Sequence, residues 1–149
     1  MIRFAAGVAC LLCVAAHSGA GAPHPRGVGM PVCLEGHPSV RQEYAKSWAV
    51  FTGRVLSARE VPPTADDRWL NGTMYTVGVR RVMRGTPPTR LDVFSENSSG
   101  RFPMDRGVVY LLFVYHDLGR YAVDNCGNSA PLSQAGAALD TLRLLVGHR

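Results

Sequence analysis

The chain of 149 residues carries few arrangements of side chains that could catalyse a reaction or hold a metal. Its five histidines are scattered, and none forms a His-x-x-x-His pair or a cluster with cysteine, so the sequence predicts no zinc site. The serines lack the Gly-x-Ser-x-Gly setting of an activated nucleophile, and the chain has neither a Gly-x-Gly-x-x-Gly motif nor a phosphate loop. We therefore expect neither an enzyme nor a bound cofactor or metal.

The first 22 residues have the pattern of a secretory signal peptide. Arg3 gives a short positive region, residues 4–16 are apolar, and small residues ending at Ala20 or Ala22 offer two cleavage positions. The apolar run is short and rich in Ala and Gly, which favours a cleaved signal over an uncleaved anchor. We expect a mature chain without a membrane span that is exported to the periplasm or to the medium.

Removal of the signal leaves two cysteines, because Cys10 and Cys13 lie within it. The remaining pair, Cys33 and Cys126, is expected to form a disulfide, since exported proteins meet an oxidising environment.

The mature chain keeps 15 basic and 11 acidic residues, a net charge of +4. Four arginines bracket one predicted hairpin and raise the question of nucleic-acid binding: Arg80, Arg81, Arg84 and Arg90. Strand alternation sends Arg80 and Arg81 to opposite faces, and export removes the usual partner, so we expect no nucleic acid.

Two segments predict helices that would flank a sheet. In residues 38–48, Ser39 and Gln42 have the spacing of a capping box. Residues 132–146 predict the second helix, with Ser133 as its cap and Gly147 as its stop. The apolar faces comprise Val40, Tyr44 and Trp48 in the first helix and Ala135, Leu139, Leu142 and Leu145 or Val146 in the second.

Five segments between the helices predict strands, at residues 49–57, 74–84, 90–95, 108–116 and 121–124. Gly53 inside the first strand predicts a bulge or a sharp bend, as barrel strands require. Residues 85–88 predict a turn, and residues 60–72 and 97–106 predict longer loops. Five strands with flanking helices suit a small closed barrel, and a sandwich of two sheets is the alternative.

The order of these motifs resembles the netrin-like family, which includes the tissue inhibitors of metalloproteinases. The matching pieces are Ala45–Val55, Tyr75–Gly85, Leu91–Phe94, Ser99–Val114 and Asp124–Gly127. The similarity to bacterial exported members spans about residues 31–144. It implies that residues 31–149 form a five-stranded closed barrel of the oligonucleotide/oligosaccharide-binding (OB) type, with one N-terminal and one C-terminal helix. The residues before it, 23–30, are rich in Gly, Pro and His and are expected to form a flexible leader.

The family pattern contains a second disulfide that this sequence lacks. Pro31 and Ser99 stand where its two cysteines would be, whereas Cys33 and Cys126 occupy the positions of the other pair. Animal inhibitors chelate the protease zinc through the amine and carbonyl of an N-terminal cysteine. Pro31 has no primary amine and the predicted cleavage lies upstream of it, so we expect no inhibition by that mechanism.

These observations predict an exported, non-catalytic binding module whose partner is an unidentified protein or surface ligand. The contact surface is expected in the two longer loops, because barrel loops vary on a rigid frame. The candidate residues are Trp69, Leu70, Asn97, Ser99, Arg101 and Phe102. Trp69 and Leu70 are large apolar residues in a polar loop and either anchor the partner or fold back onto the barrel. The alternative function is inhibition of a protease, such as a metalloproteinase, through the same loops.

Overall fold

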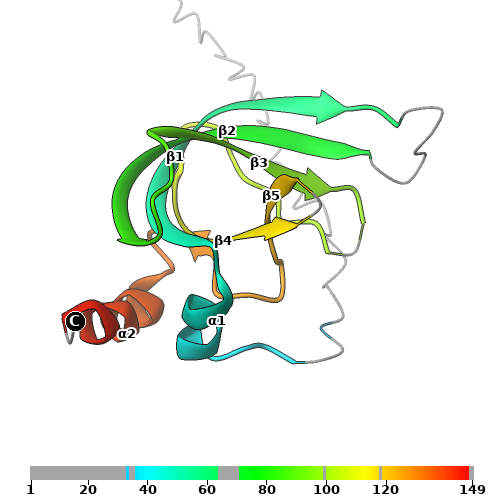
Figure 1. The fold of residues 1–149 in the computed structure, drawn as a ribbon. Helices are drawn as coiled ribbons and strands as arrows, with labels where there is room; N and C mark the ends of the chain where they lie inside the picture. Colours follow the sequence, from blue (N-terminus) through cyan, green and yellow to red (C-terminus); the bar gives the residue numbers. More distant parts are fainter. Residues whose placement is uncertain (1–32, 34–35, 64–70, 99, 118, 148–149) are drawn as a thin grey trace, which may run out of the picture.

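The computed structural model describes residues 33, 36–63, 71–98, 100–117 and 119–147. This part of the chain folds into a six-stranded sheet with two helices. Helix α1 (Val40–Lys46) precedes the sheet in the chain and α2 (Gly136–Gly147) follows it. The two helices lie next to each other on the same side of the strands (Figure 1). The predicted signal peptide and leader lie outside the described residues.

The strands are paired in a ring. They are β1 (Ala49–Val61), β2 (Gly72–Arg84), β3 (Arg90–Glu96), β4 (Val109–Asp117), β5 (Arg120–Val123) and β6 (Ala130–Pro131). The order is β1-β2-β3-β5-β4-β6, and β1 also pairs with β4, so the pairings return to their starting strand. Strands β3 and β5 run parallel and share one pair, Phe94 with Ala122, whereas the other neighbours are antiparallel. Figure 1 shows the strands curving around a common centre.

Strand β1 is longer than predicted and contains the expected irregularity. Its pairing with β2 shifts register between Thr52 and Gly53, which confirms the bulge. A Cβ atom on Gly53 would lie 2.5 Å from Val77 Cγ1, so the close approach of β2 requires glycine there. Pairing with β2 continues as far as Val61 and Gly72, so the ends of the predicted loop 60–72 belong to strands instead.

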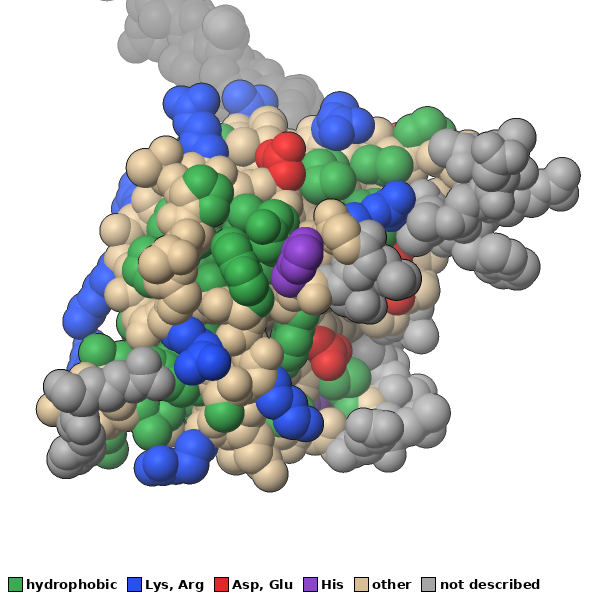
Figure 2. Space-filling model, viewed as in Figure 1, with side chains coloured by type: hydrophobic (Ala, Val, Ile, Leu, Met, Phe, Trp, Pro, Cys, Tyr) green, Lys and Arg blue, Asp and Glu red, His purple; other side chains and the backbone are tan. Residues whose placement is uncertain are grey.

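Strand β4 is buried along most of its length because it separates two hydrophobic clusters. Tyr110, Leu112 and Val114 face the cluster enclosed by the strands, and Leu111 and Phe113 face the cluster beneath the helices. All five are at most 2 % exposed, and the strand predicted at residues 108–116 is confirmed. On the face shown in Figure 2, hydrophobic side chains gather near the middle, whereas Lys and Arg side chains are spread around the edge.

The first helix begins where the sequence predicts. The Ser39 hydroxyl accepts a hydrogen bond from the Gln42 backbone N–H, and the Gln42 side chain accepts one from the Ser39 N–H, which completes the capping box. Tyr44 is buried against the helix-side cluster, where Val40 also packs. Trp48 lies beyond the end of α1 and packs against the other cluster.

The second helix begins four residues later than predicted. Residues 130–131 form β6 and pair with β4. The Leu132 N–H continues this pairing by donating to the Val109 carbonyl (2.8 Å), so the helix starts only after it. Ser133 therefore lies before the helix and is not its cap. The predicted apolar face is otherwise correct: Ala135 and Leu142 are buried, and Leu139 and Leu145 pack against the same cluster, whereas Val146 is 39 % exposed.

Candidate functional site

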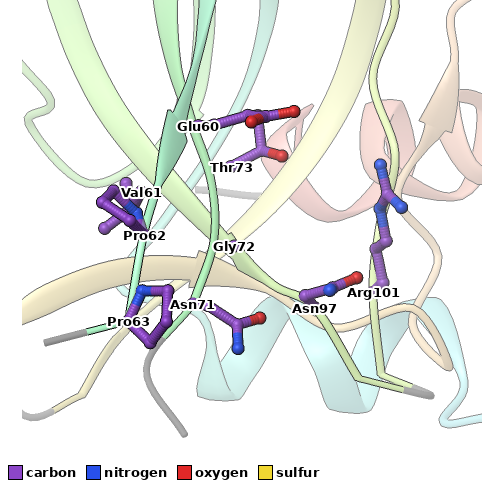
Figure 3. Close-up of a pocket in the computed structure, with 9 residues that line it drawn as sticks. All are labelled: Glu60, Val61, Pro62, Pro63, Asn71, Gly72, Thr73, Asn97 and Arg101. Atoms are coloured by element: carbon purple, nitrogen blue, oxygen red, sulfur yellow. The ribbon is translucent and has the colours of Figure 1, made fainter. Parts of the chain in front are cut away.

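The described residues at both ends of the predicted loop 60–72 lie next to the predicted loop 97–106, at one end of the sheet. Together with the adjoining strand ends they line a hollow of about 550 Å³ (Figure 3). The described lining residues are Glu60, Val61, Pro62, Pro63, Asn71, Gly72, Thr73, Asn97 and Arg101. This volume lies within the range of about 300–1,000 Å³ that is typical of small-ligand sites.

Strand pairing fixes the floor of the hollow. Gly72 pairs with Val61 of β1 on one side and with Glu96 of β3 on the other. A Cβ atom at position 72 would overlap the Ser95 carbonyl oxygen, so glycine allows β3 to approach this closely. Beyond the paired strands, the Asn97 N–H donates to the Asn71 carbonyl (2.9 Å) and ties the second loop to the first.

The walls of the hollow are polar and carry opposite charges. Glu60 and Arg101, both exposed, lie on opposite sides of it (Figure 3). Asn71, Thr73 and Asn97 add two amides and a hydroxyl. Within the described ranges, no hydrogen bond or ion pair engages the side chains of these five residues. They are therefore available to a ligand as donors and acceptors.

The structure separates the predicted contact residues into three groups. Asn97 and Arg101 line the hollow. Phe102 does not belong to the surface: it is 7 % exposed, its ring packs edge-on against Tyr110, and it faces the cluster between the strands. Trp69, Leu70 and Ser99 lie outside the described residues.

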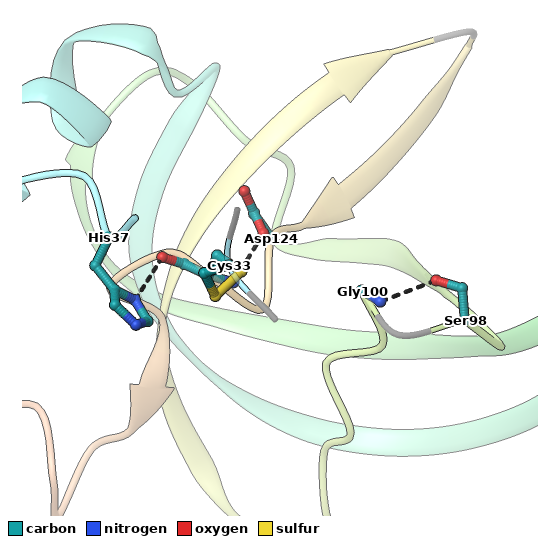
Figure 4. The surroundings of a disulfide bond; sticks show 6 residues. Cys33, His37, Ser98, Gly100 and Asp124 are labelled. Atoms are coloured by element: carbon teal, nitrogen blue, oxygen red, sulfur yellow. Dashed lines mark hydrogen bonds between the residues drawn. A yellow bond between two sulfur atoms is a disulfide. The ribbon is translucent and has the colours of Figure 1, made fainter. Parts of the chain in front are cut away.

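A second, larger groove of about 980 Å³ runs beside the disulfide bond (Figure 4). Cys33 and Cys126 are joined as predicted, across a sequence separation of 93 residues. His37 Nδ1 donates to the Cys126 carbonyl (3.0 Å), and the Cys126 N–H donates to the Asp124 carboxylate (2.8 Å). The groove thus lies where the start of the folded chain is attached to the segment after β5.

Glu43, which the sequence analysis did not single out, is the most unusual side chain at this groove. It projects from α1 and is 0 % exposed. Its Oε2 accepts hydrogen bonds from the Asn128 backbone N–H (2.5 Å) and side-chain Nδ2 (2.6 Å). Among the described residues, its Oε1 has no hydrogen-bond partner that meets normal geometry. A Cβ atom on Gly127 would overlap Oε1, so glycine at 127 makes room for the carboxyl group.

Burial raises the pKa values of two side chains at this groove, Glu43 and Tyr115. Desolvation raises the pKa of Glu43 above 4.5, although hydrogen bonds from Asn128 and Tyr115 act in the opposite direction; the nearby Asp124 charge adds to the rise. The pKa of the Tyr115 hydroxyl is also raised, first by burial and then by Glu43, so it stays protonated. The contacts of the Glu43 carboxyl group join α1 to residues 127–128.

One feature of the sequence could have drawn attention to Glu43. Position 43 is three residues after Val40 and directly before Tyr44, so it borders the apolar stripe of the helix. A charged residue bordering a buried stripe normally turns toward solvent. Glu43 is buried because residues 127–128, which are distant in sequence, pack against its carboxyl group.

His116 lies near the end of β4, in the β4–β5 hairpin. It pairs with Tyr121 across the β4–β5 hairpin, and their rings lie 4.7 Å apart between centroids. The Tyr121 ring in turn lies 4.5 Å from that of Trp48. Trp48 and Tyr121 pack against the cluster between the strands, so these rings form part of its boundary.

Comparison with known proteins adds no family assignment. The sequence matches no protein-family model and no curated protein. Within the described ranges, His, Cys, Asp and Glu side chains form no group of three that could hold a metal ion. In the same part of the chain, none of the helices has the length and apolar character needed to cross a membrane.

Proposed function

We propose that this chain is an exported, non-catalytic binding module that holds its partner at the hollow of Figure 3. The observation that carries this proposal is one concave surface, lined by the adjoining ends of β1 and β2 and by Asn97 and Arg101 of the loop after β3, on which no described hydrogen bond or ion pair engages the polar side chains. Such loops on a paired-strand frame keep their groups in place before a ligand arrives, which lowers the entropic cost of binding.

The proposed frame is a closed OB-type barrel of the netrin-like type. The pairing of β1 with β4 supports closure, because it joins the two ends of the strand order around a common hydrophobic cluster. The disulfide between Cys33 and Cys126 agrees with the resemblance and with export.

The positions of the ionisable groups with shifted pKa values support a non-catalytic role for the hollow. Groups with shifted pKa values concentrate at active sites in enzymes. Among the described residues, burial raises the pKa values of Glu43 and Tyr115, which border the groove beside the disulfide, and of Tyr110, whose hydroxyl accepts a hydrogen bond from the Asp105 N–H. None of these three groups lines the hollow.

Affinity capture tests the proposal. The mature, oxidised chain is immobilised and exposed to the cell envelope and culture medium of its source, alongside an Asn97→Ala/Arg101→Ala variant. Arg90→Ala is the matched control, since Arg90 is also exposed but begins β3 at its opposite end. We expect one partner to be retained by the native chain and the control, and at least fivefold less of it by the double variant.

Equal capture by all three proteins would overturn the proposed surface. Assays of exported proteases in the presence of the native chain test the alternative function. If the native chain inhibits a protease and the Asn97→Ala/Arg101→Ala variant does not, the chain is a protease inhibitor and not a simple binding module.

A further inference from the structure

We infer that the disulfide between Cys33 and Cys126 is a redox-sensitive switch that controls whether Glu43 is enclosed. While the bond is intact, it holds residues 124–128, which we call the flap, against the start of the folded chain. Reduction by an external dithiol, at a pH where the carboxyl group ionises, releases the flap from α1 while the strands stay folded. The switch lies at the groove beside the disulfide and does not depend on what binds at the hollow.

The composition of the flap gives it little hold on the rest of the molecule. Its sequence is Asp-Asn-Cys-Gly-Asn, and each of the five residues is partly or fully exposed. Apart from the cysteine, it has no apolar side chain that could pack into either hydrophobic cluster. Segments with few buried apolar contacts open at a lower free energy than the core does.

The residues on either side of the flap are attached to β4 by contacts that do not involve the disulfide. Before the flap, Val123 pairs with Val114 and is buried. After it, the Ser129 hydroxyl accepts a hydrogen bond from the Phe113 N–H (2.9 Å), and β6 then pairs with β4. The flap can therefore move away from α1 without breaking the pairing of the strands.

Besides the disulfide, hydrogen bonds join the flap to α1 and to the residues before it. His37 Nδ1 donates to the Cys126 carbonyl (3.0 Å), as Figure 4 shows, and Asn128 Nδ2 donates to the Pro38 carbonyl (3.0 Å). The backbone N–H and Nδ2 of Asn128 both donate to Glu43 Oε2. Each bond contributes little net free energy, because water replaces it when the flap opens.

Glu43 makes closure of the flap depend on pH. Burial raises its pKa above 4.5, and the charge of Asp124 adds to the rise, whereas hydrogen bonds act in the opposite direction. The titratable groups that face it are the Tyr115 hydroxyl of β4, which stays protonated, and Asp124 of the flap; His37 and Lys46 line the same groove. The closed flap is therefore most stable below pH 4.5 and loses stability as the pH rises through the pKa of the closed form.

Reduction and ionisation act together. With the bond intact, the flap stays next to α1, so the hydrogen bonds re-form after each opening and the carboxyl group stays covered. After reduction, the hydrogen bonds alone must offset the cost of enclosing a carboxylate. The protonated acid carries much less of that cost, so the reduced flap stays closed at low pH.

The redox step is thiol–disulfide exchange. A thiolate of the dithiol attacks one sulfur of the bond and displaces the other as a cysteine thiolate, and the second thiol of the reductant then displaces the remaining cysteine. Two electrons and two protons pass to the protein, which gains two thiols, and the reductant becomes a disulfide. Cys33 and Cys126 are both partly exposed and line the groove, so a dithiol can approach the bond.

Hydrogen exchange of the mature chain, corrected for intrinsic rates, tests this inference. The probe is the Asn128 backbone N–H, which is bonded to Glu43, and the N–H groups of residues 111–114 in β4 report whether the fold persists. Reduction with dithiothreitol at pH 7 should lower the protection of Asn128 at least tenfold and that of β4 less than threefold. When the reduced chain is moved to pH 4 without oxygen, the protection of Asn128 should return to within threefold of the oxidised value.

Two variants separate the effect of the bond from that of the acid. Reduced Glu43→Gln should keep the protection of Asn128 within threefold of its oxidised value at pH 7, because the amide carries no charge and keeps an oxygen for Asn128. Reduced Glu60→Gln is the matched control and should open as the native chain does, since Glu60 is exposed. Cys33→Ser/Cys126→Ser should open at pH 7 without reductant.

Three results would overturn the inference. The first is unchanged protection of Asn128 when thiol labelling shows both cysteines reduced. The second is an equal loss of protection at Asn128 and at residues 111–114, which would show that the disulfide holds the whole fold and not the flap. The third is opening of reduced Glu43→Gln to the same extent as the native chain. If the double serine variant does not fold, the reduced native chain supplies the same comparison.

Discussion

Glu43 is a buried acid that contributes to the structure through its hydrogen bonds and not through its charge. Two donors from Asn128 converge on one of its oxygens, and Gly127 lies against the other. Enclosing a charged carboxylate is costly, and the two hydrogen bonds offset only part of that cost. The protonated acid is therefore favoured more in the folded chain than in the unfolded chain.

The pH dependence of stability should report this difference. Because the folded-state pKa of Glu43 is raised above 4.5, its stabilising contribution is complete below that pH and is lost as pH rises through the folded-state value. In Glu43→Gln the amide oxygen keeps the bonds from Asn128 and no charge forms. Urea unfolding between pH 4 and pH 8 should show that the variant gains stability relative to the native chain as pH rises.

Glu60→Gln serves as the control for that experiment, because Glu60 is exposed and its substitution should leave the native pH profile nearly unchanged. A Glu43→Gln profile parallel to the native one would contradict the assignment of the raised pKa to Glu43.

At the scale of single elements, α1 depends on its cap to an unusual degree. It has only seven residues, and helices this short are not stable without capping and packing. Its cap exchanges hydrogen bonds between Ser39 and Gln42, and its buried side is held by Glu43 and Tyr44. The Tyr44 hydroxyl donates to the Met83 carbonyl (3.0 Å), which attaches the helix to β2.

Ser39→Ala should therefore destabilise the protein by about 1 kcal/mol, since it removes the side-chain acceptor for the Gln42 N–H. Ser133→Ala is the matched control. Its serine was predicted as a cap from sequence, but it lies before the start of α2 and is exposed, so we expect a change within about 0.5 kcal/mol. Chemical denaturation measures both, and equal losses would show that Ser133 caps a helical turn in solution.

At the scale of the whole molecule, one covalent link joins the segment before α1 to the segment after β5. Cys33 precedes α1, and Cys126 follows the last strand of the ring, 93 residues later. A link across so long a segment restricts the unfolded chain strongly, and the loop-entropy model predicts about 4–5 kcal/mol of stabilisation. The link also holds residues 124–128, which carry the partners of Glu43.

Cys33→Ser/Cys126→Ser should lower the free energy of unfolding by about 4–5 kcal/mol. Reduction of the native chain by dithiothreitol should lower it by a similar amount and should have no effect on the double variant. Intact-mass analysis of the native chain after thiol labelling should find neither cysteine modified. Labelling at both positions, or a variant as stable as the native chain, would contradict the structural role of the disulfide.

Features that depend on neighbouring residues could be predicted from the sequence. The cap at Ser39 and Gln42, the apolar faces of both helices apart from Trp48 and Val146, the strand alternation and the bulge at Gly53 all follow from spacings of four residues or fewer. The cysteine pair was predictable for a different reason, since only two cysteines lie outside the predicted signal peptide. The described residues of the predicted loop 97–106 lie outside strands and helices, as their composition indicates, whereas of the predicted loop 60–72 only residues 62, 63 and 71 are described outside strands.

Other features required contacts between distant segments. The position of Ala130 and Pro131 on β4 delays α2 past Ser133, and the pairing of Val61 with Gly72 extends β1 into a predicted loop. Phe102 leaves its loop for the core because the strands enclose an apolar space that a ring can fill. Glu43 is enclosed because Gly127 and Asn128 close over it. The spacing of neighbouring residues determines which helices and strands form. Whether a side chain is buried depends on which distant segment packs against it, and only the tertiary structure brings that segment into place.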